Sequence, residues 1–447
     1  MRPTQTPAVI DTLVLCRWLL PIVPKDRILQ DYAVAIHDGR IVDLCPQSEA
    51  TIRFKADTTL HLQEHLVMPG LINAHVHAGV RLLRGAAPHM TGESDLHSRL
   101  WPADLGILNA DFVRDSTRLA MAEMIRSGTT CFANMYFLPE IAAEAARDCG
   151  MRCQLSFPVF DCVDAAGQNG ELQIRKGLQL HDHYRGQPSI KVACAPSALS
   201  DETLTKIATY ANELDLSIHI NMHETQAEIA QSLHLYGERP LQRLFNLGLL
   251  MPATQLVHMT QLSEEDCALV EQCNAQVIYC PESNLYHANG VCPIDQLSER
   301  DVNVALGTDG APNCGLDLFA ELKSAALRRR TQQSHPDPLL PHQALRMVTI
   351  DGARALGWHA EIGSLEHGKY ADMIAIEMHA LEQQPLYNLA SHIVQGHTGA
   401  RVSHSWISGR LVMQDRQLLT LNEQGVIARA HAWQKHVGEP DRNQGTR

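Results

Sequence analysis

Two histidines separated by one residue, His75 and His77, stand at the end of an apolar run that begins near Val67. In a β-strand, alternate side chains project from the same face, so these two imidazoles would lie side by side. Imidazole nitrogens are preferred ligands of zinc and related transition metals. The spacing therefore predicts half of a metal site at the end of a strand.

Further polar residues at the ends of apolar segments could complete a hydrolytic centre, namely Asn221, His223, Glu224, His258 and Asp309. A metal held by neutral imidazoles and one carboxylate keeps a position for water, which then ionises near neutral pH. One nearby carboxylate can accept the proton of that water, and a second can donate a proton to the substrate. We assign the first role to Asp309 and the second to Glu224.

The middle of the chain predicts the elements that position these residues. Short apolar segments alternate with helical patterns at a spacing typical of repeated β-α units. They cover residues 128–133, 190–195, 216–221, 255–259, 276–280 and 302–306. With one strand before His75 and one after Met151, eight strands can be drawn. This favours the α/β class and a (β/α)₈ TIM-like barrel, whose chemistry lies at the C-terminal strand ends. His219, within one of these strands, is expected to be a buried core histidine.

Both ends of the chain show a different sequence pattern, in which short apolar runs are separated by turns. This pattern is typical of a small β-domain. We expect a composite β-sandwich formed by residues 1–66 and 358–447, and a metal-dependent hydrolase barrel over residues 67–357.

The composition of the chain argues against several classes of partner. The 447 residues include 37 basic and 50 acidic ones, for a formal charge of −13, which argues against a nucleic-acid partner. No apolar stretch approaches the roughly 20 residues that span a bilayer, so no membrane association is expected. The 12 cysteines include no C-x-x-C pair, which indicates a reduced, cytoplasmic protein.

The segment from Pro69 to His77 resembles the first-strand signature of the amidohydrolase superfamily. Longer strings are similar to its TRZ/ATZ group, which includes 5-methylthioadenosine/S-adenosylhomocysteine deaminases and chlorohydrolases. These strings cover residues 127–132, 257–262, 280–285, 306–310, 351–357 and 363–372. The resemblance implies a barrel with a β-sandwich, usually a homodimer or higher homo-oligomer, that acts on a small-molecule substrate.

The resemblance also implies a mechanism, which is hydrolytic deamination at the purine 6-position with one divalent metal, normally Zn²⁺. In that scheme His75, His77 and Asp309 bind the metal, and Glu224 and Asp309 also contact the substrate. His258 would orient or polarise the attacking water and the leaving ammonia.

The chain departs from the family pattern at three places. The family's His-x-x-Glu motif supplies a third metal-binding histidine, but three residues before Glu224 the chain has Asn221. An amide oxygen is a poor zinc ligand beside two imidazoles, and His223 could replace it only if the strand end shifted. The segment after Cys194 is shortened and lacks a substrate-contacting histidine. Where relatives place a ribose-binding glutamate, the chain has Ser94, with Glu93 one residue earlier.

Two hypotheses remain open from the sequence. The first is a working metal-dependent deaminase, or a related amidohydrolase or chlorohydrolase, with an altered substrate. The second is a catalytically impaired relative that keeps the fold and acts as a binding or assembly subunit.

Overall fold

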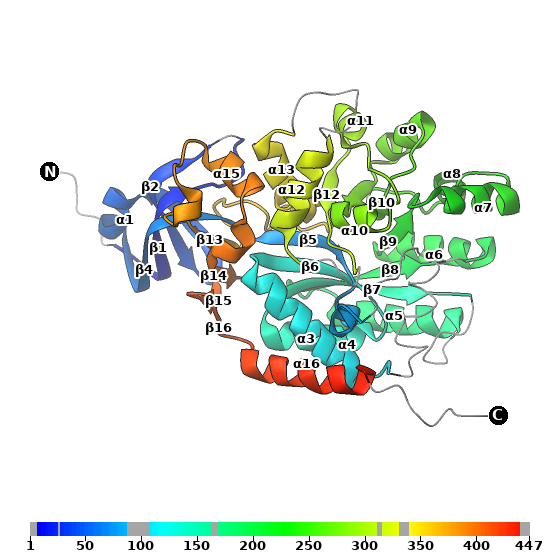
Figure 1. Ribbon diagram of the computed structural model, residues 1–447, viewed down its shortest axis with the longest axis horizontal. Coiled ribbons are helices and arrows are strands. Elements are labelled where there is room, and N and C mark those ends of the chain that lie inside the picture. The colour runs from blue at the N-terminus through cyan, green and yellow to red at the C-terminus, as the bar shows by residue number, and fades with distance from the viewer. Residues whose placement is uncertain are drawn as a thin grey trace. The chain divides into compact units, whose positions relative to one another are not determined.

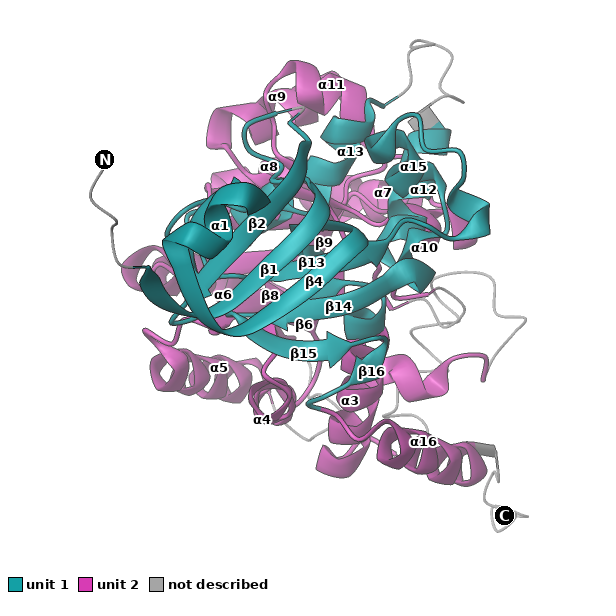
Figure 2. Cartoon of the chain, turned by 90° about the vertical axis from the view of Figure 1, so that its left-hand side faces the viewer, with its two compact units in different colours: residues 1–73, 124–131, 317–420 teal, residues 74–123, 132–316, 421–447 magenta. Residues whose placement is uncertain are grey.

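The computed structural model describes residues 7–25, 27–86, 107–161, 169–197, 199–310, 315–329 and 339–438. The chain divides into two compact units, which Figure 2 colours separately. Unit 1 comprises residues 1–73, 124–131 and 317–420, and unit 2 comprises residues 74–123, 132–316 and 421–447.

Unit 1 contains a mixed eight-stranded sheet built from both ends of the chain. Its strands are β1 (Ala8–Leu19), β2 (Leu29–His37), β3 (Arg40–Pro46), β4 (Phe54–Pro69), β13 (Met373–Glu377), β14 (Val402–Ile407), β15 (Arg410–Gln414) and β16 (Gln417–Leu418). Their order is β16-β15-β14-β13-β4-β1-β2-β3. The long strand β4 joins the two halves, because it pairs with β1 on one side and with β13 on the other.

Both faces of this sheet carry apolar residues. Val14 and Cys16 of β1 pack in one core cluster, while Leu13 and Leu15 pack in a second. Alternating side chains of one strand thus bury on opposite faces, which explains why residues 13–16 of β1 are all apolar. The helices of unit 1 are α1 (Gln47–Arg53), α12 (Leu318–Arg329), α13 (Pro341–Met347), α14 (Ile350–Ala355) and α15 (Leu389–Gln395), with 3₁₀ turns η2 (Leu381–Gln383) and η3 (Thr398–Arg401).

The second sheet, which lies mainly in unit 2, has eight strands in strictly sequential order. They are β5 (Leu71–Val76), β6 (Thr129–Met135), β7 (Arg152–Val159), β8 (Ile190–Pro196), β9 (Ser217–Met222), β10 (Thr254–His258), β11 (Gln276–Tyr279) and β12 (Val304–Leu306). Neighbouring strands pair in parallel. The eight strands expected from the sequence are all present, and the (β/α)₈ barrel is confirmed.

Helices alternate with these strands around the sheet, as Figure 1 shows. They are η1 (Ala78–Leu83), α3 (Ala110–Arg126), α4 (Pro139–Cys149), α5 (Gly170–Tyr184), α6 (Asp201–Leu214), α7 (Gln226–Tyr236), α8 (Pro240–Asn246), α9 (Glu264–Cys273), α10 (Pro281–Tyr286) and α11 (Ile294–Glu299). A further helix, α16 (Glu423–Gly438), follows all the strands in sequence. Over the described residues, none of the helices is both long and apolar enough to cross a bilayer.

The barrel closes where its first strand meets its last. Val76 forms a parallel bridge with Asp309. The carbonyl oxygen of His75 accepts hydrogen bonds from the backbone N–H groups of Thr308 and Asp309, each at 3.0 Å. Closure of the sheet therefore brings the first pair of candidate ligands beside the last one.

Gly307 allows this close approach. A Cβ atom at residue 307 would lie 2.8 Å from both Cβ and the carbonyl oxygen of His75. We expect Gly307→Ala to force the strands apart and to reduce the free energy of unfolding by ~1–3 kcal/mol. Gly425→Ala is the matched control, because its Cβ would meet only the side chain of Asn422 at 3.3 Å. Thermal unfolding of both variants checks this, and equal midpoints would contradict it.

Candidate metal centre and active site

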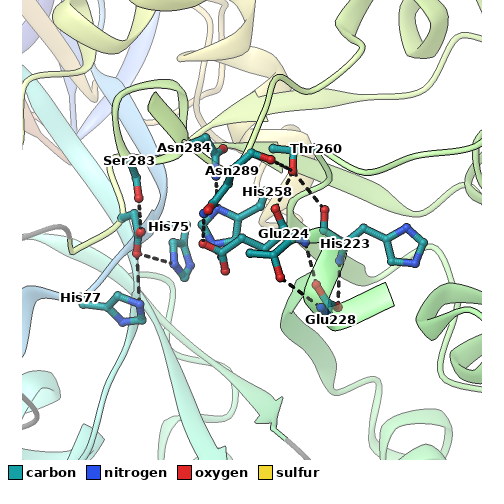
Figure 3. Close-up of polar contacts among 12 residues, drawn as sticks. His75, His77, His223, Glu224, Glu228, His258, Thr260, Ser283, Asn284 and Asn289 are labelled. Atoms are coloured by element: carbon teal, nitrogen blue, oxygen red, sulfur yellow. Dashed lines mark hydrogen bonds and ion pairs between the residues drawn. The ribbon is translucent and has the colours of Figure 1, made fainter. Parts of the chain in front are cut away.

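Three side chains at the closure of the barrel converge on one point. His75 Nε2 lies 3.3 Å from Asp309 Oδ1, and His77 Nε2 lies 3.2 Å from the same oxygen. One ligand atom of each residue lies within 4.8 Å of the others. Figure 3 shows both rings directed toward the same region. This arrangement of two imidazoles and a carboxylate can hold a single divalent cation.

Neighbouring residues fix the orientation of these three groups. Ser283 Oγ donates a hydrogen bond of 2.6 Å to Asp309 Oδ2, which leaves Oδ1 facing the histidines. His77 Nδ1 lies within hydrogen-bond distance of the carbonyl oxygen of Met135. Since a carbonyl only accepts, His77 carries a proton on Nδ1, which leaves Nε2 as the nitrogen that a metal would take.

Burial and mutual contact determine the charges. Burial opposes ionisation of Asp309, but the facing imidazoles of His75 and His77 outweigh it and hold the pKa of Asp309 well below its usual value. Burial lowers the pKa of His75. For His77 burial has the same tendency, but the contact with Asp309 prevails and raises its pKa. The carboxylate of Asp309 is therefore ionised at the point where the three side chains meet.

One more oxygen near this strand end lacks a protein partner. Asn221 belongs to β9, and its Oδ1 is buried without a hydrogen bond, as is Nε2 of His75. Asn221 shares the face of β9 that carries His219, whose ring contacts His75. An unsatisfied buried acceptor is costly, and a cation would satisfy Asn221 Oδ1. The residues present therefore fit a metal, with a donor set of two imidazoles, a carboxylate and an amide oxygen.

Glu123 connects the segment that follows His77 with the segment that follows Asp309. Arg81 of η1 donates to Glu123 at 2.6 and 2.9 Å. The backbone N–H of Leu316, beyond Asp309, donates to the same carboxylate at 3.3 Å. Glu123 therefore fixes the spacing of the segments after His77 and Asp309.

Glu224 lies beside this centre in a constrained turn. The carboxylate of Glu228 accepts the backbone N–H groups of His223 at 3.0 Å and Glu224 at 2.7 Å. The side chain of Asn289 donates to Glu224 Oε1 at 2.7 Å, and Thr260 Oγ1 donates to the Glu224 carbonyl at 2.7 Å. Backbone and side chain of Glu224 are thus both held in place (Figure 3).

His258 connects Glu224 with the ligand cluster. Its Nε2 lies 3.4 Å from Glu224 Oε2, and its Nδ1 lies 3.0 Å from the side-chain nitrogen of Asn284. An amide nitrogen donates, so His258 Nδ1 accepts and its proton resides on Nε2. Burial lowers the pKa of His258 to about 4. The ring is therefore neutral and directs an N–H group toward Glu224.

His223 does not approach the ligand cluster, so its prediction as a replacement ligand is wrong. The strand β9 ends at Met222, and His223 has a positive φ of 51°. This left-handed turn directs the ring away from His75 and His77 (Figure 3). Its Nε2 accepts the backbone N–H of Leu241 at 3.1 Å.

Sequence reasoning gave no role to Ser283, Asn284 or Asn289, although the first two lie in one of the recognised strings. These residues reach the site from α10 and the segment after it, which only the folded chain reveals. The predicted substrate residues Glu93 and Ser94 lie outside the described residues. The shortened segment after Cys194 leads from the end of β8 into α6, which begins at Asp201.

Comparisons with known proteins agree with this geometry. The family model described as "Amidohydrolase family" matches residues 66–412. A 5-methylthioadenosine/S-adenosylhomocysteine deaminase from Saccharophagus degradans is 45% identical over 437 residues, which cover 97% of this chain and 98% of the relative.

Solved structures are similar over almost the whole length. An adenosine deaminase from Xanthomonas campestris with bound zinc has 35% identity and a TM-score of 0.94, covering 97% of this chain and all of that one. A zinc complex of an atrazine chlorohydrolase from Arthrobacter aurescens has a TM-score of 0.86 and covers 94% of this chain and 99% of its own. Its 22% identity supports the fold alone.

The buried ring of His223 predicts a pH-dependent stability. Burial lowers its pKa from 6.5 to about 4. Between these values the unfolded chain binds a proton that the folded chain does not, so the free energy of unfolding falls as the pH is lowered. For His223→Gln, which keeps an acceptor for Leu241, we expect the decrease from pH 7.5 to pH 5 to be smaller by about 2 kcal/mol.

Urea unfolding at both pH values measures this difference. His234→Gln is the control, since His234 is exposed on α7. An equal pH dependence in wild type and His223→Gln would rule out the buried neutral state.

Proposed function

Because this chain belongs to the amidohydrolase family and is therefore a hydrolytic enzyme of non-peptide C–N bonds, we propose that it deaminates adenosine-type nucleosides. The proposed substrates resemble 5-methylthioadenosine and S-adenosylhomocysteine. The observation that carries this proposal is the convergence of His75, His77 and Asp309 with Glu224 and His258 alongside. Full-length similarity to a deaminase of these nucleosides supports it.

We further propose that His75, His77 and Asp309 hold one divalent ion, with Zn²⁺ as the first candidate. The buried Oδ1 of Asn221, which lacks a hydrogen-bond partner, supports this assignment. Such an ion would supply the Lewis acidity that makes water a nucleophile near neutral pH. The zinc in the similar adenosine deaminase structure is consistent with this choice.

The chain's own residues would then move the protons. Asp309, ionised and oriented by Ser283, accepts a proton from the attacking water. Glu224 donates a proton to the ring nitrogen beside the attacked carbon, where negative charge develops. His258, neutral and with its N–H directed toward Glu224, positions the water and the leaving ammonia. Nothing in the comparisons supports the alternative of a catalytically impaired relative.

Turnover of a nucleoside panel tests the function directly. Protein reconstituted with Zn²⁺ is expected to release ammonia from 5-methylthioadenosine, S-adenosylhomocysteine, 5′-deoxyadenosine or adenosine, with the absorbance change of adenine-to-hypoxanthine conversion. Absence of turnover on every adenosine derivative, at one bound metal per chain, would reject the proposed substrate class.

Glu224→Gln tests the proton donor. The amide keeps the size of the side chain and can still contact Asn289, but it cannot donate a carboxylic proton. We expect kcat to fall by about 10²–10⁴-fold, while the bound metal per chain stays unchanged. Ser232→Ala on α7 is a control that removes a buried hydroxyl whose hydrogen bond goes to the carbonyl oxygen of Glu238 and not to a site residue. A kcat within a few-fold of wild type would contradict the assigned role.

Asn221→His tests the donor set. An imidazole binds Zn²⁺ better than a neutral amide oxygen, so the variant is expected to retain more zinc during dialysis against a chelator. Asn221→Leu, which offers no ligand atom, is expected to retain less than wild type. Equal zinc content in all three proteins, measured by elemental analysis, would exclude residue 221 from the metal site.

A further inference from the structure

Behind the ligand His75 lies a second histidine, not a carboxylate or carbonyl. His75 Nδ1 is 2.9 Å from His219 Nε2, and His219 Nδ1 is 2.7 Å from Ser156 Oγ. All three side chains are fully buried. They come from β5, β7 and β9, which are alternate strands of the barrel and so contribute to one layer of its interior.

Hydrogen bonding links the proton positions of these three groups. A neutral imidazole has one N–H donor and one acceptor nitrogen, so in a histidine pair one ring donates and the other accepts. The position of the proton on His75 therefore fixes that on His219, which in turn fixes whether Ser156 donates or accepts. Only two arrangements satisfy every contact.

In the first arrangement, His75 carries its proton on Nε2 and directs it toward Asp309. Its Nδ1 then accepts from His219 Nε2, and His219 Nδ1 accepts from the Ser156 hydroxyl. In the second arrangement, His75 Nε2 has a free lone pair. His75 Nδ1–H then donates to His219 Nε2, and His219 Nδ1–H donates to Ser156 Oγ. Both arrangements place one proton on each side chain. Exchange between them requires each ring to release its Nε2 proton to water and to take up one proton from water at Nδ1, while Ser156 keeps its hydroxyl proton and only turns it, so protons and net charge balance.

Only the second arrangement allows His75 to bind a metal. We propose that Ser156 and His219 form a tautomer relay that adopts the first arrangement in the metal-free protein and the second when a divalent ion binds. The proposal rests on the metal site proposed above. The hydroxyl of Ser156 makes the relay reversible, because it can donate or accept.

His77 provides an internal contrast. Its Nδ1 faces the carbonyl oxygen of Met135, which can only accept. His77 therefore keeps a proton on Nδ1 whether or not an ion is present, and only its Nε2 can become a ligand atom. Of the two imidazole ligands, only His75 has to move a proton to its other ring nitrogen, and that change extends through His219 to Ser156.

The ¹⁵N shifts of histidine side chains distinguish the two tautomers. In uniformly ¹⁵N-histidine-labelled full-length protein, we expect the protonated nitrogen of His219 to change from Nε2 to Nδ1 when Zn²⁺ is added. The resonances of His219 are assigned by their absence in His219→Gln. His77 is expected to keep its proton on Nδ1 throughout.

A matched pair of variants tests the effect on metal affinity. The amide of His219→Gln can present either its oxygen or its nitrogen to His75, whereas His219→Leu fills the space without a hydrogen bond. We expect His219→Leu to bind Zn²⁺ about tenfold or more weakly than wild type, with His219→Gln closer to wild type. Competition with a chelator measures both affinities.

The outcomes separate the relay from the metal site. If Zn²⁺ shifts the His77 resonances but His219 keeps one tautomer, the relay is rejected and the metal site stands. If Zn²⁺ perturbs neither histidine, both proposals fail. Equal affinities for His219→Leu and His219→Gln would show that His219 acts only by filling space, which also rejects the relay.

Discussion

The hydrogen bonds between the His75 carbonyl and the backbone of Thr308 and Asp309 are the constraint on which the site depends. These hydrogen bonds close the barrel. His75, whose ring is one proposed ligand, therefore also supplies the carbonyl oxygen that holds Asp309, a second proposed ligand, in place. The imidazole and the carboxylate are thereby aligned by the main chain. Side chains such as Ser283 refine this alignment but do not create it.

Low solvent exposure gives the site its electrostatic character. His75 is fully buried and Asp309 is 9% exposed, so their interaction is little screened by water. Burial alone would favour a neutral carboxyl, yet the adjacent imidazoles reverse that preference. Burial also keeps His258 neutral, since it lowers the pKa of this ring to about 4 although Glu224 lies 3.4 Å away and Asp309 acts in the opposite direction. For His77 burial acts in the same way, but the contact of 3.2 Å with Asp309 prevails and raises the pKa.

The barrel could be predicted because its strands are short apolar runs, several of which are followed by polar residues. The rule that barrel chemistry lies at the C-terminal strand ends was enough to bring His75, His77 and Asp309 into one prediction. The orientation of His223 could not be predicted, since strict alternation fails where the backbone turns left-handed after Met222. Asn289 and Ser156 were also missed, because nothing in their local sequence shows what they contact.

The proposed ligands follow the first and the last strand of the barrel, and this order along the chain limits when the site can form. A nascent polypeptide that has reached residue 77 offers two imidazoles, but it lacks the carboxylate until residue 309 has been synthesised and has formed its bridge with Val76. The proposed metal site is therefore complete only once the barrel has closed, and a truncated chain without residue 309 would lack its carboxylate.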